Sequence, residues 1–273
     1  MSTTINHVDS VDPVTERSRA VWTSGDFGRI AVGYTPGSAE FVARLSLWQG
    51  ERVLDVACGT GNQAIPAAQA GALTTGIDIA PNLIEQASAN AARAGVAARF
   101  EVGDAENLPC SDGSFDTTMT MFGAMFAARP DRAAAELLRV TRIGGRIAMA
   151  NWTPTGFIGQ MLKIVVGYVP PPPGAISVLL WGDENTVRER LADAQQISCI
   201  PRRITFNYPQ NPAETVRLFL DWYGPTLKAY QSLDEMNREA FERDLVDLWT
   251  ENNRANDGAT RVESEYLEVI AIR

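Results

Sequence analysis

The sequence predicts an α/β fold in which a seven-stranded sheet carries helices on both faces. Short apolar runs rich in β-branched residues alternate with stretches whose apolar residues recur at helical spacing. Such alternation is typical of a mostly parallel sheet with crossover helices. Glycines and acidic residues follow several of the runs. Because ligands of open α/β sheets bind beyond the carboxyl ends of the strands, these residues indicate where a binding site lies.

The first strand is expected at residues 52–56, which have the length and β-branched content of a buried strand. Gly59 and Gly61 follow it, and glycine lets the backbone turn tightly and approach a ligand closely. A helix should begin near Asn62. The segment is therefore a strand, a ligand-binding loop and a helix.

Acidic residues stand at the ends of three successive strands. Asp55 lies in the first strand, Asp78 ends a strand at residues 73–77, and Asp104 follows a strand at residues 99–102. A carboxylate accepts both hydroxyl protons of a ribose diol, or a proton of an exocyclic amine. The three acids together predict an adenosine site. We expect Asp78 to lie at the surface, so that its loss would do little harm to the fold.

Two ligand classes compete for this loop. Residues 59–64 satisfy the loose dinucleotide fingerprint G-x-G-x-x-G/A, which would indicate a nicotinamide-dependent oxidoreductase. In that class the loop faces an anionic pyrophosphate, which Asp55 would repel. In a site for S-adenosylmethionine the same carboxylate faces the cationic amino end of methionine. The position of Asp55 therefore favours S-adenosylmethionine.

Five segments carry a family resemblance. They are residues 53–61, 76–78, 103–109, 114–116 and 142–146. On these residues the chain resembles a class I S-adenosylmethionine-dependent methyltransferase, nearest the ubiquinone/menaquinone-biosynthesis-like branch (methyltransferase type 11). The resemblance runs from about Ala31 to the C-terminus. It implies a Rossmann-like sheet with an antiparallel last strand, S-adenosyl-L-methionine as cofactor and S-adenosyl-L-homocysteine as product.

The resemblance also implies a role for each loop position. The loop from Asp55 to Gly61 would hold the methionine end, Asp78 the ribose, and Asp104 with the Ala105 amide the adenine. Ile79 would flank the adenine, and Phe122 would lie near the reactive sulfur. The expected cofactor-binding residues are Asp55, Ala57, Gly59, Gly61, Asn62, Asp78, Ile79, Asp104, Ala105 and Phe122. Ala57 departs from the glycine that many members carry.

The remaining elements are expected in this order. Residues 1–14 form a tail, 14–31 a helix or loop with Trp22 and Phe27, and 38–47 a helix. Within the alternating core, a helix runs from 81 onward with Ile84, Ala87 and Ala91 facing the sheet, a helix at 131–141 is closed by Gly144 and Gly145, and the fifth strand spans 146–152. The later elements are an apolar helix at 156–168, a strand at 203–208, two helices at 213–229 and 234–252, and the last strand at 266–272. We expect residues 1–30 to be a tail and cover segment and residues 31–273 the methyltransferase domain.

Residues 155–200 are expected to be an acceptor-side lid insertion in that domain. An apolar helix is followed there by the proline run at 170–173. Proline stiffens a segment into extended geometry, so residues 156–181 could swing as a unit about Gly174 and Gly182. The apolar and aromatic character of this segment favours a small hydrophobic or amphipathic acceptor.

Composition excludes several classes. The formal charge of −9 would repel a polyanion, which argues against a nucleic-acid partner. The three cysteines lack C-x-x-C spacing, so neither a disulfide framework nor a metal site is expected. No apolar stretch reaches the ~20 residues of a membrane span, and we expect a cytoplasmic protein. The oligomeric state is left open.

No catalytic residue is assigned. Methyl transfer to a small-molecule oxygen, nitrogen or carbon acceptor proceeds in line, so alignment and exclusion of water supply most of the rate. The sole histidine, His7, lies in the tail. Other base candidates, each read more readily as a packing or cap residue, are Tyr34, Asp26, Asp183, Tyr208 and Tyr223. A non-catalytic S-adenosylmethionine-binding protein is an alternative with the same clamp residues.

Overall fold

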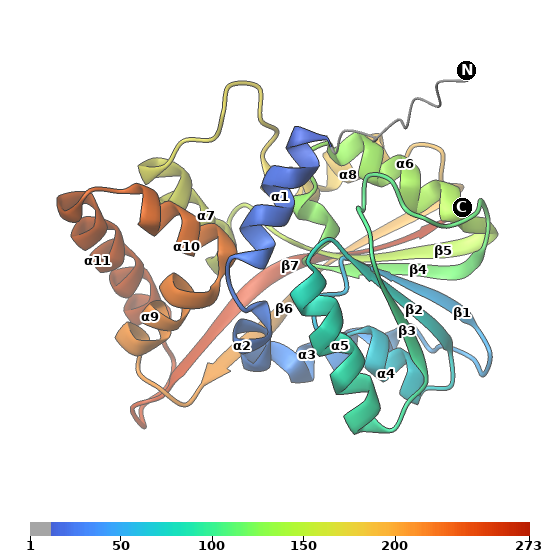
Figure 1. Cartoon of the computed structure of the whole chain (residues 1–273), viewed down its shortest axis with the longest axis horizontal. Helices are drawn as coiled ribbons and strands as arrows, with labels where there is room; N and C mark the ends of the chain where they lie inside the picture. Colours follow the sequence, from blue (N-terminus) through green and yellow to red (C-terminus); the bar gives the residue numbers. More distant parts are fainter. Residues whose placement is uncertain (1–11) are drawn as a thin grey trace, which may run out of the picture.

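The computed structural model describes residues 12–273, and a single twisted sheet runs through them (Figure 1). The strand order is β3-β2-β1-β4-β5-β7-β6. The strands are β1 (Arg52–Val56), β2 (Leu73–Asp78), β3 (Ala98–Val102), β4 (Phe115–Met121), β5 (Thr141–Trp152), β6 (Gln196–Tyr208) and β7 (Thr260–Ile272). β1 to β5 pair in parallel, and β7 is antiparallel to both β5 and β6. The predicted seven-stranded Rossmann-like sheet with an antiparallel last strand is confirmed.

The strand order reverses between β1 and β4. β1 is followed by β2 and β3 on one side, whereas β4 and β5 continue on the other. A crevice forms outside the carboxyl ends of the strands at such a switch point. The loops after β1 and β4 therefore meet at the place where a ligand of this fold binds.

Eleven α-helices accompany the sheet within residues 12–273. They are α1 (Pro13–Thr23), α2 (Phe27–Ala31), α3 (Thr35–Arg44), α4 (Ala64–Gln69), α5 (Pro81–Ala94), α6 (Pro130–Val140), α7 (Phe157–Tyr168), α8 (Glu184–Arg190), α9 (Pro212–Trp222), α10 (Gly224–Ser232) and α11 (Glu235–Asn252). Pro81 opens α5, and Ile84, Ala87 and Ala91 are buried as predicted. None of these helices is long and apolar enough to cross a membrane.

Several boundaries differ from those expected. The helix after the first loop begins at Ala64 rather than near Asn62. Gly144 and Gly145 do not close a helix, because β5 already starts at Thr141 and Gly144 turns within it at φ 70°. The helix expected at 213–229 is two helices, since Tyr223 is extended and Pro225 starts a new first turn. β6 and β7 are both longer than expected, because their ladder continues over thirteen residue pairs.

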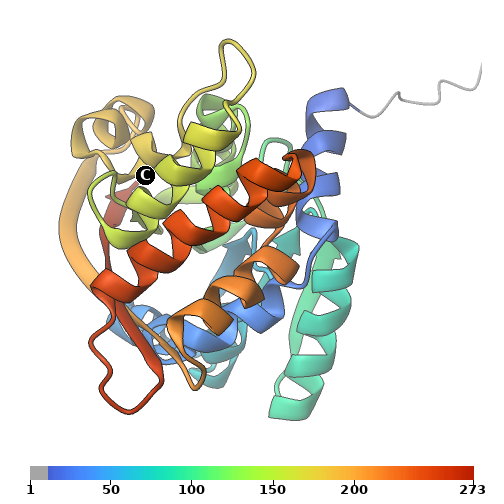
Figure 2. The same ribbon diagram turned by 90° about the vertical axis from the view of Figure 1, so that its left-hand side faces the viewer.

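A layer of four helices, α7, α9, α10 and α11, packs beside the long β6–β7 pair (Figure 2). α11 crosses both α9 and α7 and buries Phe241, Leu245, Leu248 and Trp249. In Figure 1, α1 lies between this layer and the parallel part of the sheet. Residues 12–31 of the expected cover segment thus form α1 and α2, while the rest of the expected tail, with His7, lies outside the described residues.

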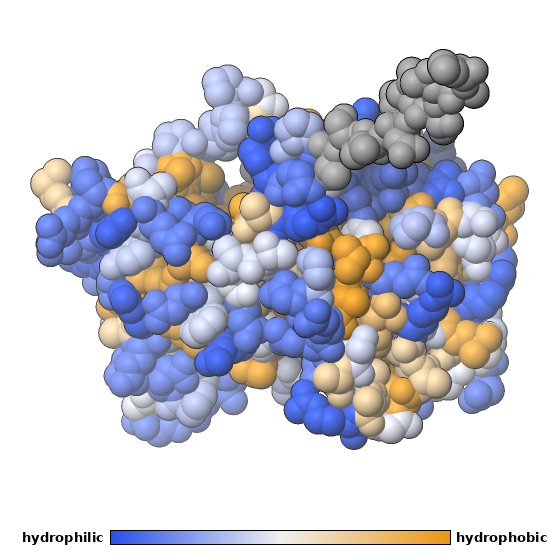
Figure 3. All heavy atoms as spheres, in the orientation of Figure 1, coloured by the Kyte–Doolittle hydropathy of each residue, from blue (hydrophilic) through white to orange (hydrophobic). Residues whose placement is uncertain are grey.

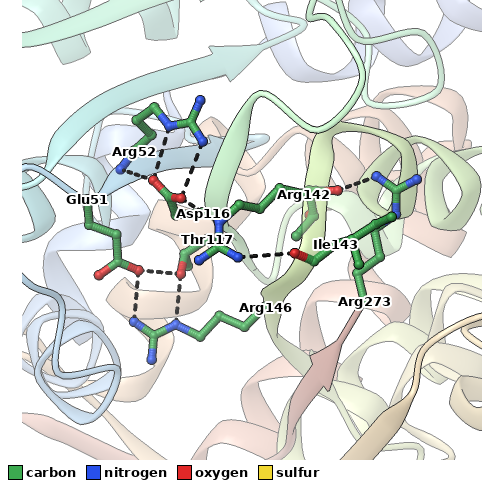
Figure 4. Close-up of polar contacts among 9 residues, drawn as sticks. Glu51, Arg52, Asp116, Thr117, Arg142, Ile143, Arg146 and Arg273 are labelled. Atoms are coloured by element: carbon green, nitrogen blue, oxygen red, sulfur yellow. Dashed lines mark hydrogen bonds and ion pairs between the residues drawn. The ribbon is translucent and has the colours of Figure 1, made fainter.

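Charged residues tie together the amino ends of β1, β4 and β5 (Figure 4). Glu51 is fully buried and accepts hydrogen bonds from Thr117 and Arg146. Asp116 accepts from Arg52 and Arg142. Its hydrogen bond with Arg52 holds the pKa of Asp116 well below its usual range. This edge lies opposite the switch-point crevice, so its charges stabilise the sheet and leave the carboxyl edge free for a site.

Candidate active site

A cavity, partly open to solvent, lies at the carboxyl ends of β1, β2 and β4. Its walls are the loops after β1, β2, β3 and β4 together with α1. In Figure 3 the face that carries α1 is largely hydrophilic, with hydrophobic side chains showing beside that helix. We call this space the first cavity.

Most of the residues predicted for the cofactor meet in the first cavity. Those that line it are Ala57, Gly59, Asp78, Ile79, Asp104, Ala105 and Phe122. Asp55, Gly61 and Asn62 do not line it. Gly61 turns the loop at φ 86°, and its amide donates to the Cys58 carbonyl. Asn62 accepts a long hydrogen bond from Thr60.

The floor of the first cavity holds unusual backbone. Ala57 and Phe122 are non-glycine residues with φ of 56° and 59°. Each such residue costs about 1–3 kcal/mol and persists only where its surroundings enforce it. Gly123 lets the two loops approach each other closely here, because a Cβ on Gly123 would lie 2.6 Å from that of Ala57. The β1 and β4 loops therefore press together beneath the cavity.

Asp78 supports the loop as well as facing the cavity. Its carboxylate accepts hydrogen bonds from the Gly59 amide at 2.8 Å and the Ala80 amide at 2.9 Å. The expectation that it lies at the surface is wrong: the residue is 7% exposed. Burial raises the pKa of Asp78, and the Ala80 and Gly59 amides oppose that rise. Each oxygen still has a second lone pair for a ligand hydroxyl.

Asp55 is a buried carboxylate without a partner. The residue is 0% exposed, and neither oxygen is hydrogen-bonded within residues 12–273. Burial raises the pKa of Asp55 well above its usual value, the Asp78 charge adds to the rise, and the nearby Ala64 amide opposes it. A buried charge is costly unless it is paired. Residues 12–273 thus leave both oxygens of this buried carboxyl group without a hydrogen-bond partner.

Asp104 joins the cavity to α1. It accepts hydrogen bonds from the Thr15 hydroxyl at 2.7 Å and from the Glu106 amide at 2.9 Å. The guanidinium of Arg129 binds both Glu106 and Asp12, which caps the start of α1. Two polar links therefore hold α1 over this edge of the first cavity.

Sequence reasoning missed several residues of the lining, most of which lie outside the family motifs. The missed residues include Thr15, Ser18 and Trp22 of α1, as well as Gln63, Glu106, Met121 and Phe126. The aromatic residues of 14–31 were the only signal in the sequence for α1. Cys58 also lines the cavity, and burial together with the Asp55 and Asp78 charges raises the pKa of its thiol. It is a neutral packing residue rather than a nucleophile.

A second, smaller cavity adjoins the first. The two share Trp22, Phe27, Tyr34, Phe122 and Phe126. The second is completed by Ile30, Trp152, Ile158, Met161, Phe206, Phe219 and Tyr223. The rings of Phe122 and Trp152 stack with centroids 3.4 Å apart. This lining contains no charged residue, so the second cavity is an apolar, aromatic extension of the first.

The base candidates separate into two groups. Asp26 and Asp183 cap α2 and α8, and the Tyr208 hydroxyl donates to the Ile30 carbonyl. Tyr34 and Tyr223 line the second cavity. Burial raises the pKa of both phenols, so they are neutral at physiological pH. Among residues 12–273, no group of three histidine, cysteine or carboxylate side chains is arranged to hold a metal ion.

Comparison with known proteins places this geometry in context. Residues 53–145 match the model of a family described as a methyltransferase domain. A Mycobacterium tuberculosis protein of undescribed activity is 40% identical over 220 residues, which cover 79% of this chain and 80% of that protein. The demethylmenaquinone methyltransferase of Paenarthrobacter aurescens is 31% identical over 160 residues, 53% of this chain and 62% of the enzyme.

A solved structure shares the fold. A phosphoethanolamine N-methyltransferase from Haemonchus contortus, determined with phosphomonomethylethanolamine and S-adenosylhomocysteine, superposes with a TM-score of 0.56. The match covers 87% of this chain and 52% of that one at 15% identity, so it speaks for the fold alone.

Proposed function

We propose, from the premise that this chain belongs to the class I S-adenosylmethionine-dependent methyltransferases, that it methylates a small, predominantly apolar molecule held in the second cavity. The observation that carries the proposal is the junction of the two cavities. The first has the acids that suit the cofactor, and the second has aromatic walls without charge. An acceptor in the second cavity would therefore reach the first at Tyr34 and Phe122.

The residues of the first cavity fit S-adenosylmethionine. Asp55, which does not line the first cavity, is the orphaned buried carboxylate, and it would pair with the ammonium of the methionine end directly or through water. Asp78 would accept the ribose hydroxyls on the lone pairs that its two amides leave. Asp104, with the Ala105 amide, would hold the adenine amine. Ile79 would pack on that ring, and Gly59, Gly61 and Asn62 shape the loop.

The protein's part in the reaction is positioning. When bound, S-adenosylmethionine supplies an electrophilic methyl group on a sulfonium that departs as a neutral thioether. Phe122, fixed in a left-handed backbone and stacked on Trp152, forms the wall between the cavities. Such fixed walls hold an acceptor in line and exclude water, and both effects lower the barrier. Because no carboxylate or histidine lines the second cavity, we assign no general base.

Two segments would cover the site. On the cofactor side we propose α1, because Thr15, Ser18 and Trp22 line the first cavity. On the acceptor side we propose the insertion at 155–200, because Ile158 and Met161 of α7 line the second cavity. The buried face of α7 favours a fixed wall there.

Calorimetry tests the cofactor assignment. The purified protein should bind S-adenosylhomocysteine and should not bind reduced nicotinamide nucleotide. Saturation at about 100 times the dissociation constant should stabilise the fold by roughly 2.7 kcal/mol. A screen of phenols, amines, carboxylates and quinols, read by release of S-adenosylhomocysteine, tests turnover. If folded, ligand-free protein binds neither S-adenosylmethionine nor S-adenosylhomocysteine, the proposal is refuted.

A further inference from the structure

The Thr15 hydroxyl and the Asp104 carboxylate form one polar edge of the first cavity. Thr15 lies in the first turn of α1, Asp104 follows β3, and both residues line the cavity. We infer that Thr15 is a specificity-determining residue for the cofactor, because with Asp104 it forms an edge that only accepts hydrogen bonds and so selects the exocyclic amine of adenine. The inference rests on the proposed function, and it adds a residue of α1 to the loop residues named there.

The Thr15 hydroxyl donates its only hydrogen to Asp104. Thr15 Oγ1 lies 2.7 Å from Asp104 Oδ2. A hydroxyl has one hydrogen and two lone pairs, so a hydroxyl whose hydrogen is engaged offers only lone pairs to a ligand. The Glu106 amide donates to Asp104 Oδ1 at 2.9 Å, and each carboxylate oxygen keeps a further lone pair. These two side chains therefore present acceptors and no donor to the cavity.

Neighbouring contacts fix Thr15 relative to Asp104. Asp12 caps the start of α1, and the guanidinium of Arg129 binds Asp12. The same guanidinium binds Glu106, two residues beyond Asp104. One arginine thus joins the first turn of α1 to the loop that carries Asp104. Since α1 has no buried residue, these polar contacts, rather than a buried apolar face, hold Thr15 over the loop.

An edge made of acceptors recognises a primary amine. The exocyclic amine of adenine has two hydrogens, and its lone pair is delocalised into the ring, so the group donates and does not accept. Asp104 and Thr15 together offer an acceptor for each of these hydrogens. A purine without the amine donates nothing there, and the acceptors lose water without gaining a partner. Thr15 therefore adds to the discrimination that Asp104 provides.

Two ligands measured by calorimetry test this role. They are S-adenosylhomocysteine and its analogue with hydrogen in place of the adenine amine. Wild-type protein should bind S-adenosylhomocysteine at least about tenfold more tightly than the analogue. Thr15→Val removes the hydroxyl and keeps the shape of the side chain. It should weaken S-adenosylhomocysteine about three- to tenfold more than it weakens the analogue, which is the scale of one hydrogen bond. Thr15→Ser keeps the hydroxyl and should keep most of the wild-type preference.

Thr23→Val is the matched control. Thr23 is an exposed residue of the same helix, it lines neither cavity, and its hydroxyl donates to the Arg19 carbonyl. The same substitution there changes α1 and leaves the edge of the cavity as it is. The ratio of the two affinities should therefore remain that of the wild type.

The ratio of affinities separates recognition from support. A loosened α1 would weaken both ligands by the same factor, whereas loss of a recognition contact changes their ratio. The inference is overturned if Thr15→Val leaves the wild-type ratio, if Thr23→Val changes the ratio as much, or if wild-type protein binds the two ligands equally. If folded wild-type protein binds neither ligand, the proposed function fails instead. The two failures are therefore distinguishable.

Discussion

Asp55 links stability to binding at the scale of one residue. Burial raises the pKa of Asp55 in the folded protein. The protonated side chain therefore favours the folded state below the pKa that Asp55 has in the unfolded chain, and this contribution is lost as the pH rises through its pKa in the folded protein. We predict that the stability of Asp55→Asn relative to wild type, without ligand, rises progressively as the pH increases above the ordinary aspartate pKa of about 4. The same variant should bind S-adenosylmethionine more weakly. Urea denaturation at several pH values, paired with calorimetry, measures both effects.

Asp116 is the control of opposite sign. Arg52 lowers the pKa of Asp116 in the folded protein. The ionised side chain therefore stabilises the fold above the pKa that Asp116 has in the unfolded chain, and this contribution is lost as the pH falls through its pKa in the folded protein. Asp116→Asn should therefore lose stability at neutral pH and leave S-adenosylmethionine binding intact. The account of Asp55 fails if both variants change stability with pH in the same direction.

Asp78 is expected to have two separable effects. Asp78→Ala removes the acceptor for the Gly59 and Ala80 amides and the proposed ribose contact together. Because hydrogen bonds to charged groups contribute about 1.5–3 kcal/mol each, S-adenosylhomocysteine affinity should fall at least about tenfold, and stability should fall as well. Asp78→Asn should be milder in both respects, since it keeps one acceptor oxygen. Unchanged affinity in the alanine variant would show that Asp78 does not hold the ribose.

At the scale of elements, α1 differs from the other helices around the site. It has no buried residue, and polar links at Asp12 and Thr15 hold its first turn. Segments with few buried apolar contacts open most readily. We predict that amides of α1 exchange hydrogen faster than those of α5, and that S-adenosylhomocysteine slows the exchange of α1 in particular. Exchange of α1 that is as slow as that of α5 without ligand would contradict this prediction.

The proline run after α7 separates two views of the acceptor side. Residues 170–177 are mostly exposed and line neither cavity, whereas α7 and Trp181 are buried against the layers beneath them. Replacing residues 170–176 with a short Gly-Ser linker should therefore leave cofactor affinity and methyl transfer within a few-fold of wild type. A hundredfold loss of transfer alone, measured as initial rates, would instead identify a swinging lid whose closure excludes water.

At the scale of the whole molecule, the sequence predicted the parallel half, β1 to β5, better than the half built from β6, β7 and four helices. The parallel half was the more predictable because β1, β2 and β3 are short and each is followed by a motif loop, so that Asp78 and Asp104 could be placed from spacing. The half built from β6, β7 and four helices has no such markers. Its break at Tyr223 and its contribution of Tyr223 and Phe219 to the second cavity depend on tertiary packing.

The two cavities of the site differ in the same way in how well their residues could be predicted. The cofactor residues come from the parallel half, whereas the second cavity draws its lining from elements that are far apart in the sequence, among them α1, α2, α7 and α9. A pattern in one segment carries no information about the segment that it will face. Burial of Asp78 was missed for the same reason, because the loop after β1, whose Gly59 amide donates to its carboxylate, packs against it.

The place of β7 in the sheet has a consequence for how the chain reaches this structure. β7 lies between β5 and β6, and β6 has no other strand partner among residues 12–273. On a ribosome, β6 and the three helices that follow it emerge before the strand that joins them to the sheet. The parallel half can therefore assemble early, while β6 and its helices cannot join the sheet, and expose apolar surface that favours aggregation, until synthesis reaches the last strand.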